Sequence, residues 1–141
     1  MNESTRIETR AHKWKALALS IVVAFALSIS LAGIAEATTL FTYSGSGIQN
    51  KASVKTAYLS SGKTCSVNHT QSRVYAQSGT TMNVAIQKQS GVGWSTVSSR
   101  NYLNDVKNQV FSSYCSAGTY RLYFKSSDSR YPFNISGSFY Y

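Results

Sequence analysis

The sequence predicts an all-β fold, a small antiparallel β-sandwich or jelly roll of about eight short strands after an N-terminal signal peptide helix. Three observations predict it. No helical period remains after Ala37, the later sequence is rich in Ser, Thr, Tyr and Val, and turn signals recur at roughly ten-residue spacing. Short strands joined by tight turns are expected from these features.

The first segment has the composition of a secretory signal peptide. An uncharged, mostly apolar run spans residues 16–34, and the small residues at positions 35 and 37 supply a cleavage site. Four basic residues precede the run: Arg6, Arg10, Lys13 and Lys15. We therefore predict a signal peptide over residues 1–37, cleaved after Ala37, and a secreted, extracellular domain over residues 38–141. The alternative is an uncleaved anchor, because a run of this length can also span a bilayer.

Turn-forming clusters divide the predicted domain into strands, because glycine tolerates positive φ and Asn and Asp bond to nearby backbone. We expect breaks at residues 44–47, 60–63, 78–80, 90–93, 101–108, 116–118 and 126–132. We expect strands at residues 40–43, 54–60, 65–69, 73–77, 81–89, 94–99, 109–114, 119–125 and 133–140.

Alternation within the later strands separates core from surface, because successive side chains of a strand point to opposite faces. We expect the core to contain Met82, Val84, Ile86, Tyr120, Leu122, Phe124, Phe133, Ile135 and Phe139, joined by Val110 or Phe111. We expect the solvent side to carry Asn83, Ala85, Gln87, Arg121, Tyr123, Lys125, Asn134, Ser136, Ser138 and Tyr140.

The predicted domain is strongly basic. Residues 38–141 contain ten lysines and arginines against two acids, Asp105 and Asp128, a net charge of +8. Such a charge favours an anionic polymer, a glycan or a membrane surface as partner, and nucleic acid through non-specific contacts alone. The alternative is a charge that serves solubility, because the basic residues are spread along the chain. We expect a monomer without a small-molecule cofactor.

Cys65 and Cys115 are the two cysteines of the sequence. In an exported protein they predict one disulfide. The alternative is a nucleophilic Cys115, because Cys115, His69 and Arg121 resemble the Cys-His-Arg set of sortase-type transpeptidases. The Ser-Ser-Tyr-Cys-Ser context differs from the Thr-Leu-x-Thr-Cys strand of that family, and a second cysteine can pair with the thiol. We therefore favour the disulfide.

Two segments of the second half resemble small secreted bacterial β-sandwich modules of the pre-peptidase C-terminal type. They are TTMNVAIQKQSGVGWSTV at residues 80–97 and CSAGTYRLYFKSS at residues 115–127, where Gly118-Thr119-Tyr120 opens a late strand. The resemblance implies an exported β-sandwich. It does not imply the calcium binding that such modules often show through acidic loops, because the predicted domain has two acids in total.

The sequence contains no strong catalytic or cofactor motif. Gly-x-Ser-x-Gly, a phosphate loop and a helical zinc motif are absent, and both acids fall in predicted turns, where such residues usually bond to backbone. We expect a secreted binding module for anionic or glycan-type cell-surface polymers, with no enzymatic activity, no cofactor and no metal. The alternatives are a secreted antimicrobial or toxin-like protein and a structural protein of an extracellular coat or matrix.

The candidate ligand-binding residues combine charge with aromatic rings, which can stack on sugars and pair with carboxylates or phosphates. They are Arg121, Tyr123, Lys125, Arg130, Tyr140 and Trp94. For Trp94 a place in the core is the favoured expectation and an exposed platform the alternative, because tryptophan is highly buried on average. The Arg121, Tyr123 and Lys125 row is expected to lie beside residues of the last strand: Asn134, Ser136 and Tyr140.

Overall fold

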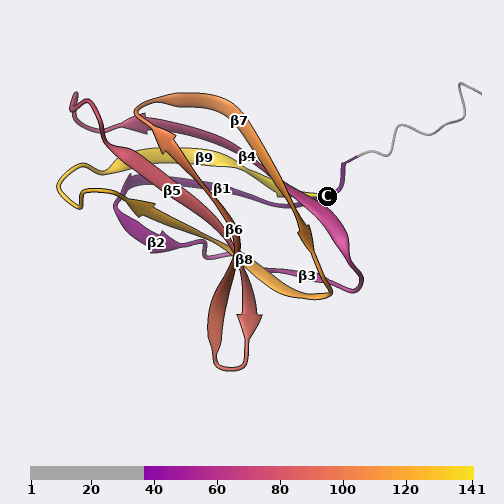
Figure 1. Ribbon diagram of the computed structural model, residues 1–141. Helices are drawn as coiled ribbons and strands as arrows, with labels where there is room; N and C mark the ends of the chain where they lie inside the picture. Colours follow the sequence, from indigo (N-terminus) through magenta and orange to yellow (C-terminus); the bar gives the residue numbers. More distant parts are fainter. Residues whose placement is uncertain (1–36) are drawn as a thin grey trace, which may run out of the picture. The chain divides into compact units, whose positions relative to one another are not determined.

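The computed structural model describes residues 37–141, which form two β-sheets (Figure 1). Every strand pairing in the two sheets is antiparallel, so the predicted all-β sandwich is confirmed. The predicted signal peptide, residues 1–37, lies outside the described residues except for Ala37, and it stays a prediction. From Ala37 to Tyr141, no helix has the length and apolar character that crossing a bilayer requires.

Sheet A, as we name the four-stranded sheet, has the strand order β1-β9-β4-β7. Sheet B has the order β2-β8-β5-β6, and β3 also pairs with β8. The strands of sheet A are β1 (Thr39–Ile48), β9 (Phe133–Tyr140), β4 (Lys63–Arg73) and β7 (Val106–Cys115). The strands of sheet B are β2 (Asn50–Ala52), β3 (Ala57–Leu59), β8 (Gly118–Ser126), β5 (Thr81–Ser90) and β6 (Gly93–Leu103).

One predicted break is wrong because a strand continues through it, and another is wider than the turn that the structure contains. Residues 44–47 belong to β1, which pairs with β9 as far as Ile48. The glycine there serves packing, since a Cβ on Gly45 would lie 2.8 Å from Ile48 Cδ1. Residues 101–108 contain a two-residue corner, Asn104 and Asp105, between β6 and β7. Asn104 takes the positive φ of 54° that this corner needs.

The predicted strand at residues 73–77 is wrong beyond Arg73, where β4 ends. The backbone N–H of Arg73 donates to Asp105 Oδ1 at 2.7 Å, so a side chain takes the place of a neighbouring strand. Val74 and Tyr75 favour strands by propensity, but they are exposed and pair with no strand among the described residues. Strand propensity did not suffice without a partner strand.

The core between the sheets contains the residues that the alternation predicted. Phe111, 8% exposed, takes the remaining place in preference to Val110, which is 44% exposed. Aromatic contacts join the two sheets, as with the Tyr43 and Phe124 rings, whose centroids are 5.0 Å apart. The core also contains apolar residues that the alternation did not assign: Phe41, Ile48, Leu59, Val67 and Tyr102.

Cys65 and Cys115 are close together in the core, but as free thiols, so the structure contains no disulfide between them. Cys65 pairs with Ser113 and Cys115 with Lys63, which puts the cysteines on a diagonal of neighbouring strands. Diagonal Cβ atoms lie further apart than those of a direct pair, and a disulfide needs a short Cβ separation. Burial, together with a hydrogen bond to Cys115, raises the pKa of the Cys65 thiol to about 12.

Candidate functional site

The outward side of β8 carries three of the sequence candidates in one row: Arg121, Tyr123 and Lys125. The strand has β5 on one side and β2 and β3 on the other, so the row runs through the middle of sheet B. We call the outward surface around it the sheet B face. Its members are Asn50, Tyr58, Asn83, Gln87, Trp94, Asn101, Arg121, Tyr123 and Lys125.

Amide side chains cross the sheet beside Lys125. Lys125 pairs with Asn50 on β2 and with Asn83 on β5. Asn83 Nδ2 donates to Asn101 Oδ1 on β6 at 2.8 Å, and the Tyr123 hydroxyl donates to Asn50 Oδ1. These bonds hold the amides in a fixed row from β2 to β6, next to the ammonium group.

Arg121 is held in place by two neighbours. Its Nε donates to Gln87 Oε1 at 2.9 Å, and its guanidinium carbon lies 4.4 Å from the centroid of the Trp94 ring. A stacked, hydrogen-bonded guanidinium loses less conformational freedom when it binds a ligand than a mobile one does. The remaining N–H groups of Arg121 can pair with a carboxylate or phosphate.

Trp94 lies outside the core, and the favoured expectation for it is therefore wrong. The pairing of β5 with β6 shifts register between Ile86 and Gln87, and such a bulge increases local twist. Beyond the shift, the far end of the β5–β6 hairpin projects past the rest of the sandwich (Figure 1). Trp94 pairs with Gln89 near the tip, where it meets Arg121 instead of core side chains.

The face also contains Tyr58, Asn50 and Asn101, which were not predicted from the sequence. Tyr58 on β3 pairs with Thr119 of β8 and is 71% exposed, so its ring extends the row beyond Arg121. Local sequence gives no signal for this position, because the three-residue β3 acquires its place by pairing with a strand about sixty residues later in the chain.

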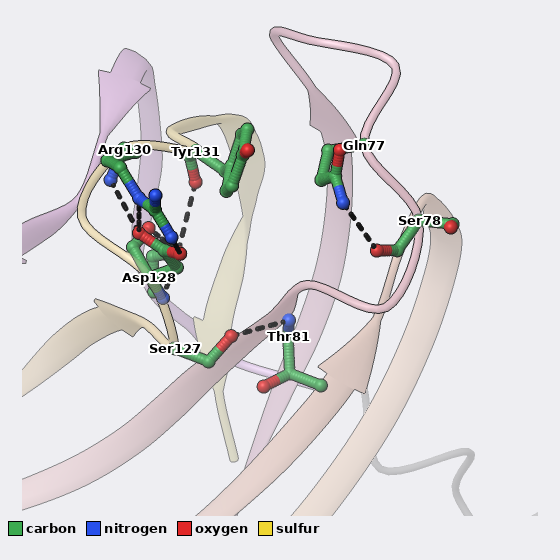
Figure 2. Close-up of polar contacts among 8 residues, drawn as sticks. Gln77, Ser78, Thr81, Ser127, Asp128, Arg130 and Tyr131 are labelled. Carbon is green, nitrogen blue, oxygen red and sulfur yellow. Dashed lines mark hydrogen bonds and ion pairs between the residues drawn. The ribbon is translucent and has the colours of Figure 1, made fainter.

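Arg130 is not a member of the sheet B face. It lies in the loop between β8 and β9, where Figure 2 shows its guanidinium beside Asp128. Arg130 Nη2 lies 2.6 Å from Asp128 Oδ2, and this contact holds the pKa of Asp128 at about 2. The same loop is tied to β5, because the backbone N–H of Thr81 donates to Ser127 Oγ at 3.0 Å. The charge of Arg130 is compensated within its own loop.

Tyr140 lies on sheet A, and its expected place beside the β8 row is wrong. It pairs with Ser66 of β4 and Thr39 of β1. Asn134 and Ser136 are also on β9 and share this outward side. The chain crosses from one sheet to the other between β8 and β9, so the two rows point to opposite sides of the sandwich. The alternation of side chains along two consecutive strands is the same whether the strands form a hairpin or lie in different sheets.

The acids of residues 37–141 are both paired away from the face. Asp128 contacts Arg130, and Asp105 contacts Arg73, whose Nε lies 3.1 Å from Asp105 Oδ1. The hydrogen bonds from Arg73 lower the pKa of Asp105. Within the described part of the chain, Arg121 and Lys125 form no ion pair. The sheet B face is therefore positive and open to an anionic ligand.

The Cys-His-Arg set of the alternative hypothesis is not assembled. His69 is buried in the core, and Arg121 lies on the outward side of the other sheet. Cys115 pairs with Lys63, six residues along β4 from His69, which corresponds to roughly 20 Å. Burial raises the pKa of the Cys115 thiol. This geometry gives Cys115 neither a base nor an exposed thiolate.

His69 takes part in a buried hydrogen-bond chain instead. Gln71 Nε2 donates to the carbonyls of Tyr102, at 3.1 Å, and Asn104. Gln71 Oε1, 2.9 Å from His69 Nε2, must then accept the imidazole proton, which leaves Nδ1 to accept from the Tyr43 hydroxyl at 2.9 Å. Burial lowers the pKa of His69, so the ring stays neutral. The role of this chain is structural.

Comparisons with known proteins give the chain no relative: no protein family, no characterised protein and no solved structure matches it. The resemblance to pre-peptidase C-terminal modules remains a prediction. The case for a function depends on the sheet B face.

Proposed function

We propose that the protein is a secreted, non-enzymatic module that binds anionic, glycan-type cell-surface polymers on the sheet B face. One observation carries the proposal: Lys125, Tyr123 and Arg121 form a cationic and aromatic row in the middle of a sheet, flanked by amides and without an ion pair among residues 37–141. Positions along one side of a strand recur about every 7 Å, so the row suits an extended ligand.

The side chains of the face match the groups of an acidic polysaccharide. Aromatic rings such as Tyr123, Tyr58 and Trp94 can stack on the apolar sides of sugar rings. Asn and Gln side chains can donate to and accept from sugar hydroxyls. Arg121 and Lys125 can pair with carboxylate or phosphate groups, and these contacts are screened by salt. We therefore expect affinity that falls as ionic strength rises.

The test is isothermal titration of the protein with polygalacturonate, an acidic polysaccharide, at low salt. Arg121→Glu combined with Lys125→Glu should weaken binding roughly 100-fold, because two attractive contacts become repulsive. The matched control is Lys63→Glu combined with Lys107→Glu on strands of sheet A, which changes the net charge equally. Equal losses in both double variants would show that net charge alone governs binding, and absence of binding by the unaltered protein would refute the proposal.

A second candidate function is contact with anionic membranes, as in an antimicrobial or toxin-like protein. Val92 is fully exposed at the tip of the projecting β5–β6 hairpin, two residues from Trp94 (Figure 1). An apolar tip beside an aromatic ring suits the interface of a bilayer. Release of dye from phosphatidylglycerol vesicles that disappears in Val92→Asp would favour this function. Polysaccharide binding without dye release would favour the first.

Export is part of the proposal, and it predicts that Cys65 and Cys115 become joined in an oxidising compartment. The two thiols are close enough to affect each other's pKa, and joining them requires the diagonal Cβ atoms to move closer together. Protein collected from the medium of an expressing cell should show no thiol that maleimide can modify after denaturation without reductant. Two modified cysteines in that protein would contradict the disulfide.

A further inference from the structure

A groove of about 500 Å³ lies at the open edge of the sandwich, between the first strand of each sheet. One wall is residues 42–46 of β1, and the other is residues 51–55, which begin in β2. The floor is apolar and consists of Ile48, Phe124 and Ile135. This groove is separate from the sheet B face, because it opens on a strand edge.

The β1 wall is formed by the backbone edge of the strand. Successive residues of a strand point to opposite faces, so a ligand on one face would contact every second residue. All five residues from Thr42 to Ser46 line the groove, whichever way their side chains point. β1 is the last strand of sheet A, with β9 as its partner and no strand on its other side within residues 37–141. Unpaired N–H and C=O groups along such an edge can accept another strand.

The groove carries positive charge on one wall. Lys51 and Lys55 line one wall, both are exposed, and neither forms an ion pair among the described residues. The β1 wall, TLFTYSGSGI, carries no charged side chain. A partner strand should therefore bring carboxylates to the lysines and apolar side chains to the floor.

We propose that the groove binds an extended acidic peptide segment of a partner protein, which adds to the free edge of β1 as a further strand of sheet A. Backbone groups of the peptide pair with β1, and the inward face of the peptide carries both apolar side chains, which cover Phe124 and Ile135, and carboxylates, which meet Lys51 and Lys55. A second copy of this chain does not fit, because its β1 has no acid to offer. The binding site goes beyond the proposed polymer binding and does not depend on it.

The first test is fluorescence anisotropy with a fluorescein-labelled ten-residue peptide in which every second residue is serine and the residues between them, which share one face of an extended strand, are valine and glutamate. Binding in the micromolar range is expected. Lys51→Glu combined with Lys55→Glu should weaken it at least tenfold, whereas Lys63→Glu combined with Lys107→Glu should change it less than twofold. Equal effects of the two double variants, or no binding to the unaltered protein, would overturn the proposal.

The second test asks whether backbone pairing is required. The same peptide with alternate N-methylated residues keeps its charge and most of its apolar surface but loses the N–H groups on one edge. It should bind at least tenfold more weakly when methylated on the edge that meets β1. Three outcomes would each count against an acidic peptide as occupant. The first is equal binding of both methylated forms and the parent peptide. The others are displacement of the peptide by laurate at the same concentration of carboxylate groups, and concentration-dependent polymerisation of the protein through β1.

Discussion

The outward surfaces of the two sheets differ in chemistry although the same period of two produces both. On β1, β9 and β4, the outward side of sheet A carries the ring of Tyr140 and no cation. Its other residues are mostly hydroxyls and amides, including Thr42, Ser136, Ser138, Ser66 and Asn68. On sheet B the corresponding positions carry cations, amides and aromatic rings. Strand alternation thus determines which side chains face solvent, and the chemical types of those side chains determine whether the surface can bind an anion. This difference is why we assign binding to sheet B.

The inward surfaces differ in the opposite sense. The inward side of sheet A contains the polar His69 and Gln71 on β4, both buried. On sheet B, the inward residues Val84, Ile86 and Leu122 are apolar. Buried polar groups are tolerated when every donor and acceptor is satisfied, so sheet A depends on a hydrogen-bond chain where sheet B depends on packing. The predictions below test these two contrasts.

The largest effect is expected at Gln71. Gln71→Leu keeps the approximate volume but leaves the His69 imidazole and the carbonyls of Tyr102 and Asn104 without their partner. The free energy of unfolding should fall by about 3 kcal/mol, measured by urea denaturation. The same substitution at Gln87, on the sheet B face, should change it by less than about 0.5 kcal/mol. Similar losses at both positions would show that the buried chain contributes nothing special.

The second prediction compares an aromatic residue on each outward surface. Trp94→Ala removes a ring that could stack on sugar and also releases Arg121 from its position. Affinity for polygalacturonate should fall about tenfold. Tyr140→Ala, on sheet A, should change it less than twofold, although the sequence analysis proposed both residues as ligand contacts. A larger loss at Tyr140 would move the binding surface to sheet A.

The alternation of apolar residues allowed much of the core to be predicted, because burial of one strand face is a local property. The burial of Met82, Val84 and Ile86 could be predicted without knowing which strands lie beside them. Strand order is not local, and so the prediction placed Tyr140 beside Arg121 although they lie on different sheets. Tyr58 was missed for the same reason, since its place on the face comes from pairing with β8.

The burial of His69 could not be predicted from the sequence, because it depends on Gln71 and Tyr43, which bond both ring nitrogens. Trp94 was expected inside on grounds of size, but the bulge after Ile86 takes the hairpin away from the core. Both positions depend on contacts with other strands, which the residues around them do not reveal.

The third prediction uses the pH dependence of stability. His69 has a pKa near 6.5 in the unfolded chain and a lower pKa in the folded protein, because burial disfavours the imidazolium. Below pH 6.5 the unfolded chain takes up a proton that the folded protein excludes, so stability is lost as pH falls. The loss should reach about 1 kcal/mol between pH 6.5 and 5.5, measured by urea denaturation. Both acids of the described residues have lowered pKa values and titrate below this range. In a His69→Asn variant, the free energy of unfolding should not fall over this pH range. If it falls as much as in the unaltered protein, another group causes the pH dependence.

The smallest effect is expected at Tyr102, the inward residue of sheet B that stacks on His69 with ring centroids 5.0 Å apart. Its hydroxyl is buried and has no hydrogen-bond partner among residues 37–141, unlike His69 and Gln71 of β4. Tyr102→Phe keeps the ring and its stacking on His69, and it removes a hydroxyl that forms no hydrogen bond in the folded protein. The free energy of unfolding should therefore stay the same or rise by up to about 1 kcal/mol. A fall of more than about 1 kcal/mol would mean that the hydroxyl is bonded in solution. The contrast between the hydrogen-bonded His69 and Gln71 inside sheet A and the packing-dominated interior of sheet B would then no longer hold.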